Sequence, residues 1–290
     1  MEEVVKNLLN RKSLIQVKNS ENVADFIVYK YFKPYIPALP SAQLYPIYPL
    51  KSFGPNEWRE YYGEVGDAPA LPADIEQILD APCPYYQAAK LMGVEEMEKI
   101  GKDRDLFYYK FWINKVRKNK PLKVKNTHLL TLIPKSVNGL PFNLAMVGKL
   151  IEKPMKGCIT KYWSFDVYNH AEVPVDKSYW VLMPKDIMPG TRNKNFEDQK
   201  KVALFNGNYV VPKVIEVATS VLMHYVRTGE YLLSDKPYTY IRCEEVRVKD
   251  GYRVWVGGFG ASGLLVNHRY YGDGFCYTCG CVCLRKFFGN

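Results

Sequence analysis

The sequence predicts an α+β protein, with a helical N-terminal portion and a mixed C-terminal portion that ends in an antiparallel sheet. Three observations carry this prediction. Apolar residues recur at helical spacing in the first third, one clear amphipathic helix follows residue 213, and short apolar runs alternate with glycine turns over 238–287. We expect helices and a proline-rich stretch over 1–50, a helical region with a basic end over 51–126, and a mixed domain over 127–290.

Proline and glycine bound the elements of the helical portion. Apolar residues have helical spacing over 4–31, whereas five prolines over 34–49 exclude regular structure there. Pro55 can occupy the first position of a short helix, and an apolar stripe over 75–79 predicts the next one. The charged stretch over 94–120 is helical in character and ends in a basic run.

The mixed portion begins with short apolar runs and contains the clearest helix. Residues 129–134 and 179–183 predict buried strands, and 142–151 fits either a helix or a strand. The apolar positions over 214–225 share one helix face, and Gly229 is placed to end that helix. The last residues then read as short strands joined by glycine turns.

Length, composition and charge bound the class of protein. A chain of 290 residues with 47% hydrophobic residues can bury a core without disulfides or metals. Its start is acidic and no apolar run approaches ~20 residues, so we expect a soluble chain without a membrane span. We expect it to be cytoplasmic, or exported without a cleaved N-terminal signal. The net charge of +10 favours acidic partners.

Part of this basic excess is local. Six cations fall within eleven residues: Lys115, Arg117, Lys118, Lys120, Lys123 and Lys125. A solvated helix end explains them, and so does a patch that contacts the phosphates of a nucleic acid.

Four of the seven cysteines lie close together near the C-terminus, at Cys276, Cys279, Cys281 and Cys283. Four thiols are the number that a tetrahedral zinc needs, but zinc ribbons usually set two pairs well apart. The alternation of the last three also suits one buried face of a strand, and a redox pair is a third interpretation. We therefore expect no cofactor, with zinc as the alternative.

Residues 258–263 match the pattern G-x-G-x-x-G of dinucleotide-binding loops. That motif requires a following helix and an acidic residue about twenty positions on. Residues 264–271 are too short for such a helix before the next glycines. The segment is therefore predicted to be a glycine-rich hairpin.

The leading functional hypothesis is a binding or interaction module without catalytic residues, which uses a face of the C-terminal sheet rich in tyrosine and glycine. Its ligand would be a protein, a glycan or an acidic partner. Aromatic rings beside cationic side chains can stack on sugars or bases, although they also fit ordinary packing between strands. The candidate residues are Tyr238, Tyr240, Arg242, His268, Arg269, Tyr270 and Tyr271.

Several stretches from about residue 50 to the end resemble a family of uncharacterised proteins from Chlamydia-like intracellular bacteria. They are Lys51-Ser52-Phe53-Gly54, Leu79-Asp80-Ala81-Pro82-Cys83-Pro84, Ser178-Tyr179-Trp180-Val181-Leu182-Met183, Pro189-Gly190-Thr191-Arg192-Asn193-Lys194, Thr239-Tyr240-Ile241-Arg242-Cys243 and Leu284-Arg285-Lys286-Phe287. The resemblance implies an intracellular bacterial source, either as a cytoplasmic protein or as a host-directed effector, and it implies no activity.

This chain departs from the family in one place. Where the family has a Gly-Val-Ala-Gly type segment, it holds Cys279 to Cys283. The order of elements over 211–287 is also similar to that of bacterial C-type-lectin-like domains, which implies a lectin-like sheet.

Overall fold

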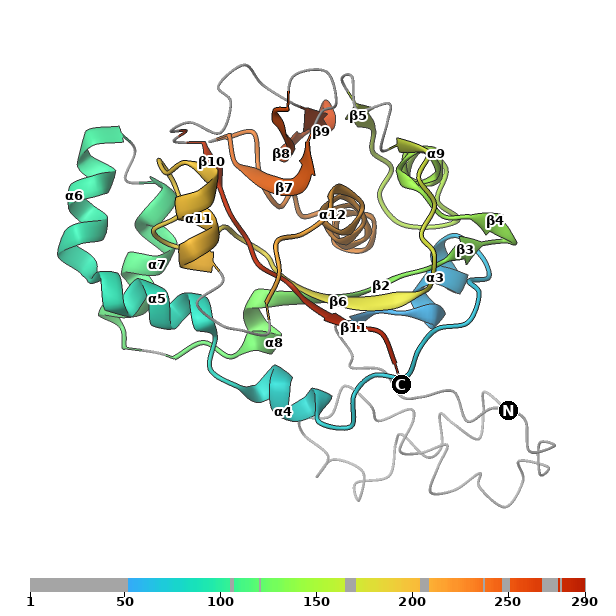
Figure 1. Ribbon diagram of the computed structural model, residues 1–290, viewed down its shortest axis with the longest axis horizontal. Helices are drawn as coiled ribbons and strands as arrows, with labels where there is room; N and C mark the ends of the chain where they lie inside the picture. The colour runs from blue at the N-terminus through green and yellow to red at the C-terminus, as the bar shows by residue number, and fades with distance from the viewer. Residues whose placement is uncertain are drawn as a thin grey trace, which may run out of the picture. The chain divides into compact units, whose positions relative to one another are not determined.

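Two sheets with one long helix between them form the body of the protein (Figure 1). The computed structural model describes residues 52–104, 107–119, 121–164, 171–203, 209–236, 238–246, 251–267, 276 and 278–289. The predictions made for residues 1–50 lie outside this part of the chain.

The first sheet contains the strands that the sequence predicted most directly. Its order is β1-β2-β6-β11, formed by β1 (Ser52–Phe53), β2 (His128–Ile133), β6 (Tyr179–Pro184) and β11 (Arg285–Phe287). β1 runs parallel to β2, and the other neighbours are antiparallel. Every residue of β2 and β6 is buried, which explains why both strands read as continuous apolar runs. A two-stranded hairpin of β3 (Ser136–Val137) and β4 (Leu140–Pro141) follows β2.

The second sheet has the predicted antiparallel strands at its centre and parallel strands at both edges. Its order is β10-β7-β8-β9-β5, formed by β10 (Cys279–Gly280), β7 (Tyr240–Val246), β8 (Arg253–Gly260), β9 (Gly263–Asn267) and β5 (Tyr162–Ser164). The central three strands are antiparallel, but β10 and β5 add to the edges in parallel. β11 leaves this sheet altogether and joins the first one. Apolar alternation marks a strand but not its partner, and this is why the sequence missed the exchange.

The glycine-rich segment is the predicted hairpin. β8 and β9 pair with Gly260 opposite Gly263, so that residues 261 and 262 form the turn. Gly257 has φ +154° and lies so close to β7 that a Cβ atom would clash with the Thr239 carbonyl oxygen. A glycine is needed at that position because the two backbones approach closely there.

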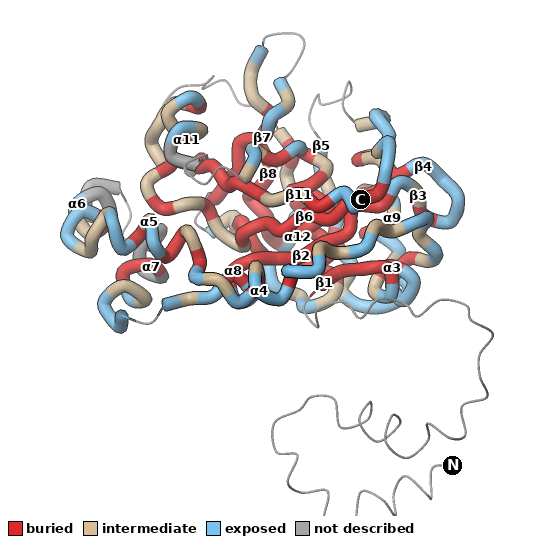
Figure 2. The backbone as a smooth tube through the Cα atoms, turned by 60° about the horizontal axis from the view of Figure 1, so that its bottom comes forward, coloured by how far each residue is buried: buried red, intermediate tan, exposed pale blue. Residues whose placement is uncertain are grey.

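The helix α12 (Val214–Thr228) lies between the two sheets and contacts strands of both (Figure 1). Nearly all of its residues are buried, polar ones included, and Figure 2 shows it among the buried strands β2 and β6. It ends as predicted at Gly229, which adopts the left-handed conformation at φ 73° while its N–H donates to the Tyr225 carbonyl oxygen at 2.7 Å. This helix therefore organises the core.

The remaining helices lie around this core. They are α3 (Pro55–Tyr61), α4 (Ile75–Asp80), α5 (Pro84–Met92), α6 (Val94–Arg104), α7 (Phe107–Arg117), α8 (Val124–Thr127), α9 (Leu144–Glu152) and α11 (Phe196–Ala203). Helices α5, α6 and α7 pack on one another around a small apolar cluster of their own. None of the helices in the described ranges is long and apolar enough to cross a membrane.

These elements confirm the α+β class. The stretch over 142–151, left open between helix and strand, is the helix α9, and Asn143 caps it by accepting a hydrogen bond from Met146 N at 2.8 Å. Hydrogen bonds between β1 and β2 cross the predicted boundary at residues 126 and 127. The lectin-like character of the second sheet stays a prediction.

Candidate functional site

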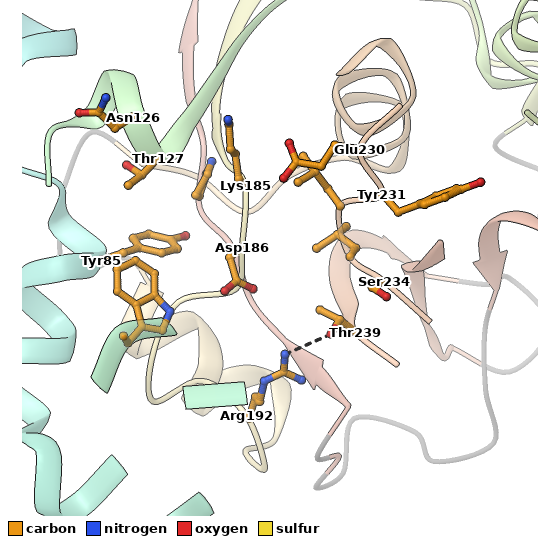
Figure 3. Close-up of a pocket in the computed structure, with 14 residues that line it drawn as sticks. Tyr85, Asn126, Thr127, Lys185, Asp186, Arg192, Glu230, Tyr231, Ser234 and Thr239 are labelled. Atoms are coloured by element: carbon orange, nitrogen blue, oxygen red, sulfur yellow. Dashed lines mark hydrogen bonds between the residues drawn. The ribbon is translucent and has the colours of Figure 1, made fainter. Parts of the chain in front are cut away.

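A cavity of about 440 Å³ lies at the C-terminal end of α12 (Figure 3). Six separate parts of the chain line it: the helices α5, α7 and α8, the end of β6 with the residues that follow it, the loop before α11, and the residues between α12 and β7. Its volume is within the range of sites that bind small organic ligands. We therefore treat it as the candidate ligand-binding site.

One wall of the cavity is aromatic. Tyr85 and Trp112 are both buried, and their ring centroids lie 6.4 Å apart. The Tyr85 hydroxyl accepts a hydrogen bond from Cys283 N at 2.9 Å, and burial raises the pKa of this phenol. Because the hydroxyl is already bonded within the chain, this wall presents to the cavity mainly the apolar surface of two fixed rings.

Charged side chains of both signs surround the cavity. Lys185 and Asp186 come directly after β6, and Figure 3 shows Asp186 in the middle of the site. Ile187 N donates to Asp186 Oδ1 at 2.8 Å. Burial raises the pKa of the Asp186 carboxyl, and the nearby Arg192 guanidinium acts in the opposite direction. Arg192 in turn donates from Nη2 to Thr239 Oγ1 at 3.4 Å, the dashed line in Figure 3.

A second carboxylate approaches the cavity from the end of α12. Glu230 is the second residue beyond the helix, and its Oε2 atom lies 2.7 Å from Nε2 of His224. Burial lowers the pKa of His224, and Glu230 partly offsets that effect. The Glu230 side chain is 60% exposed, so its carboxylate is held in place yet reaches solvent at the cavity.

Thr127 and His128 lie where α8 meets β2. Thr127 lines the cavity, and its Oγ1 atom lies 2.9 Å from Nδ1 of His128. His128 is buried, with the ring of Tyr85 at 5.9 Å. Burial lowers the pKa of His128 to about 3, so the imidazole is neutral at physiological pH.

A second cavity, of about 560 Å³, lies at the N-terminal end of α12. There the chain itself surrounds the fully buried Glu216. Its Oε1 atom accepts a hydrogen bond from the Tyr179 hydroxyl at 2.7 Å and lies 2.7 Å from Lys286 Nζ, and its Oε2 atom accepts from Lys213 N at 2.7 Å. This carboxylate is therefore satisfied without a ligand.

The structure describes three of the seven residues that were predicted for the tyrosine-rich face. Tyr238 is 51% exposed and stacks on Tyr240 at 6.0 Å, but Tyr240 is only 4% exposed and Arg242 is fully buried. The Arg242 guanidinium donates from Nη1 to the Lys194 carbonyl oxygen at 3.0 Å and to Gln199 Oε1 at 3.2 Å. Lys194 precedes α11 and Gln199 belongs to it, whereas Tyr240 packs with Trp255 and Cys279. Of the three residues, only Tyr238 is exposed. The other four candidates, His268, Arg269, Tyr270 and Tyr271, lie outside the described residues.

The basic run is partly paired with acidic side chains. Arg117 Nη2 lies 2.5 Å from Glu98 Oε1, and Lys123 and Lys125 lie 3.3 and 2.7 Å from Asp80 Oδ1. These pairs are exposed, and pairs of that kind are weak enough for a phosphate to compete. Lys115 and Lys118 belong to the end of α7 and the turn after it, and Lys120 lies outside the described residues. A nucleic-acid contact here stays a prediction.

The four clustered cysteines do not share one strand face. Only Cys279 belongs to a strand, β10, where it packs with Tyr240 and Trp255. Cys281 and Cys283 are buried in a different cluster. Cys276 and Cys279 are neighbours, with their Sγ atoms 2.7 Å apart. In the described ranges no three His, Cys, Asp or Glu side chains are grouped as metal ligands, and zinc binding stays a prediction.

The residues of the cavity were not predicted from the sequence, although a signal for some of them exists. Lys185 and Asp186 are polar residues placed directly after a buried apolar strand, and Glu230 directly follows the glycine that ends the clearest helix. Polar side chains at the ends of buried elements often line sites. No local signal indicates that these ends meet Tyr85 and Trp112.

Comparison with known proteins adds no relative. No family model, no curated protein and no solved structure matches this chain. The resemblance to proteins of Chlamydia-like bacteria therefore stays a prediction.

Proposed function

We propose that the protein is a binding module whose ligand is a small zwitterionic molecule held in the cavity at the C-terminal end of α12. The observation that carries this proposal is the mixture of charges around one small cavity. The carboxylates of Asp186 and Glu230 line it together with two cationic side chains, those of Lys185 and Arg192. This proposal keeps the hypothesis of a binding module but assigns binding to the cavity and not to the tyrosine-rich face of the sheet.

The chemistry of the lining favours a zwitterion over a singly charged ligand. A ligand with one charge would meet like charge as well as unlike charge, and like-charge contacts in a partly desolvated site are costly. A ligand with an ammonium and a carboxylate can match both signs. The fixed rings of Tyr85 and Trp112 supply the apolar surface against which its carbon frame would pack. Free amino acids and short peptides have this combination.

The test is a ligand screen read out by thermal unfolding of the whole chain. Apolar amino acids and dipeptides are compared with their N-acetylated amides, which keep the carbon frame and lose both charges. A ligand at about 100 times its Kd adds about 2.7 kcal/mol to the free energy of unfolding, so binding is readily seen. We expect the zwitterions to raise Tm and the blocked compounds to bind at least ~10-fold more weakly.

Two matched variants locate the effect. Asp186→Asn removes a carboxylate of the cavity, whereas Asp176→Asn makes the same change in the second cavity at the other end of α12. We expect the first variant alone to weaken binding. Equal binding of zwitterions and blocked compounds, a response only to neutral sugars, or equal losses in the two variants would each contradict the proposal.

A further inference from the structure

Cys276 and Cys279 form a close thiol pair at the edge of the second sheet. Their Sγ atoms lie 2.7 Å apart, compared with about 2.05 Å in a disulfide bond. Cys276 precedes β10 and Cys279 is its first residue, and β10 pairs with β7 at the edge of the sheet (Figure 1). The spacing C-x-x-C is the one that brings a partly exposed and a buried thiol together in dithiol redox sites. Only a small movement is needed to join the two sulfurs.

The two cysteines differ in exposure. Cys279 is fully buried against Tyr240 and Trp255, whereas Cys276 is partly exposed at the margin of the same cluster. A reagent from solvent can therefore reach Cys276, while Cys279 can be reached only by Cys276 itself. This division of access is required of an attacking and a resolving thiol.

The surroundings also separate the two thiols electrostatically. The hydrogen bond with Cys279, helped by Thr278 and by the charge of Arg242, lowers the pKa of Cys276 to about 6. Burial raises the pKa of Cys279 far above its usual value, and the neighbouring Cys276 thiolate raises it further. Cys276 is thus the nucleophile, and Cys279 keeps its proton until a mixed disulfide forms.

Arg242 owes its position to the interior of the protein. Its side chain is fully buried, bonded to Gln199 Oε1, and its guanidinium lies 5.6 Å from the centre of the Trp255 ring. Gln199 Nε2 in turn donates to the Cys279 carbonyl oxygen at 3.3 Å. The positive charge is therefore fixed beside the thiol pair by groups that also hold the backbone of Cys279.

We propose that Cys276 and Cys279 form a redox site that exchanges with low-molecular-weight disulfides of the glutathione type. The Cys276 thiolate attacks one sulfur of the disulfide, the S–S bond of the reagent breaks, and one thiolate leaves and takes up a proton from water. The Cys279 thiol then loses its proton to water and attacks Cys276 Sγ, which expels the second thiolate. Two protein thiols are oxidised by two electrons to one disulfide, and the reagent disulfide is reduced to two thiols.

The other two cysteines of the segment are a second pair, whose side chains are hydrogen-bonded to each other, and they serve as the buried control for the first pair. Cys281 and Cys283 are buried with Met188, Tyr209 and Val211, away from the Cys276 pair. The Cys281 thiol donates to the Val282 carbonyl oxygen at 3.2 Å. The proposed site is independent of the ligand cavity, so that either can fail without the other.

The test uses the full reduced chain in buffers with different ratios of glutathione to glutathione disulfide. Samples are quenched with acid and alkylated, and the state of each cysteine is read by peptide mass spectrometry. We expect one disulfide, between Cys276 and Cys279, that forms reversibly with the ratio. Cys279→Ser should stop the reaction at a stable glutathione adduct on Cys276. Cys276→Ser should abolish oxidation of Cys279, and Cys281→Ser should leave the midpoint unchanged.

A second measurement distinguishes a redox thiol from a merely accessible one. The Cys279→Ser substitution removes the hydrogen bond that contributes most to the low pKa of Cys276. The pH profile of Cys276 alkylation is therefore measured on the wild-type chain with limiting reagent. We expect the rate to rise through a midpoint near pH 6 and, at pH 5.5, to exceed that of an unstructured cysteine peptide about tenfold. A midpoint at or above pH 8 would overturn the proposal.

Two further outcomes would also overturn it. One is a disulfide that forms between other cysteines, or that Cys281→Ser abolishes. The other is about one zinc per chain in protein purified under reducing conditions, lost in Cys276→Ser, because a metal-bound thiolate would be a ligand instead of an exchanging thiol. That last result would restore the zinc interpretation of the segment.

Discussion

The two ends of α12 both carry carboxylates beside a cavity, but the hydrogen bonding of these carboxylates differs. At the N-terminal end, Tyr179, Lys286 and the backbone N–H of Lys213 all satisfy Glu216. At the C-terminal end, Asp186 accepts a hydrogen bond from Ile187 N, Glu230 is paired with His224, and both carboxylates line the cavity. The comparison teaches that burial of a carboxylate does not by itself mark a site. The carboxylates of the proposed ligand site line their cavity, whereas Glu216 is not among the residues that line the second cavity.

The two ends also differ in how the helix dipole acts on a negative charge. The first turn of a helix favours negative charge, and the Glu245 carboxylate accepts from Val214 N at 3.0 Å there. The last turn disfavours negative charge, yet Glu230 lies just beyond it. The carboxylates at the first end therefore interact favourably with the helix dipole, whereas Glu230 lies where the dipole disfavours negative charge and is paired with His224.

The largest loss of stability is expected from disrupting the ion pair between Glu216 and Lys286. Glu216→Gln removes the charge that offsets Lys286, whose side chain is only 17% exposed. Leaving one charge of a buried pair without its partner costs about 3 to 5 kcal/mol. Urea unfolding should show this loss, and the double variant Glu216→Gln with Lys286→Met should recover much of it. A loss below about 1 kcal/mol in the single variant would contradict a structural role for Glu216.

Acid should weaken the other end of the helix through His128. Its pKa is about 3 in the folded protein and about 6.5 in an unfolded chain, so the unfolded state binds the extra proton between these values. The stabilising contribution is complete above pH 6.5 and is lost as pH falls toward 3, at up to about 1.4 kcal/mol per pH unit.

The variant His128→Asn isolates this slope, because an amide can keep a hydrogen bond to Thr127 Oγ1 but does not titrate. Urea unfolding of both proteins between pH 7 and pH 4.5 gives the comparison. We expect the wild-type protein to lose more free energy of unfolding than the variant as the pH falls, because only the wild type has an imidazole at residue 128 that takes up a proton on unfolding. Parallel pH profiles would show that His128 is not buried as described.

A smaller effect is expected at the residue that ends α12. Gly229→Ala places a side chain at φ 73°, a conformation that costs a non-glycine residue about 1 kcal/mol. The same change displaces the following residue, Glu230, and so should weaken zwitterion binding more than it weakens the fold. Unfolding curves and ligand titrations on one preparation test both parts. Unchanged stability would place this position outside the left-handed region.

The smallest effect on stability is expected from Asp186→Asn. Because burial raises the pKa of this carboxyl, the folded state binds the proton more tightly, and ionisation lowers stability as pH rises above about 4. Asparagine removes that cost but also removes the favourable interaction of the carboxylate with Arg192. We therefore expect the free energy of unfolding to change by about 0.5 kcal/mol or less at neutral pH. Urea unfolding at pH 7 measures this change. A loss as large as that expected for Glu216→Gln would show that Asp186 is as important for stability as Glu216 and would contradict the difference between the two ends.

The sequence by itself determined the elements whose signals are local. The apolar stripe and the terminal glycine define α12, and the continuous apolar runs define β2 and β6. Glycines at residues 260 and 263 define the hairpin between β8 and β9. Each of these signals acts within a few residues, through backbone conformation or side-chain periodicity, so it can be read without knowing what the segment contacts.

Only the tertiary structure decided which residues meet. It placed β11 beside β6, packed Tyr240 against Trp255 and Cys279, and bonded Arg242 to Lys194 in the segment before α11. It brought Cys276 and Cys279 together as a close thiol pair. It also brought the polar residues after β6 and α12 to a wall of Tyr85 and Trp112. These outcomes depend on packing and desolvation between segments far apart in the chain. No single window of sequence contains that information, because the same residues could be exposed or buried according to what covers them.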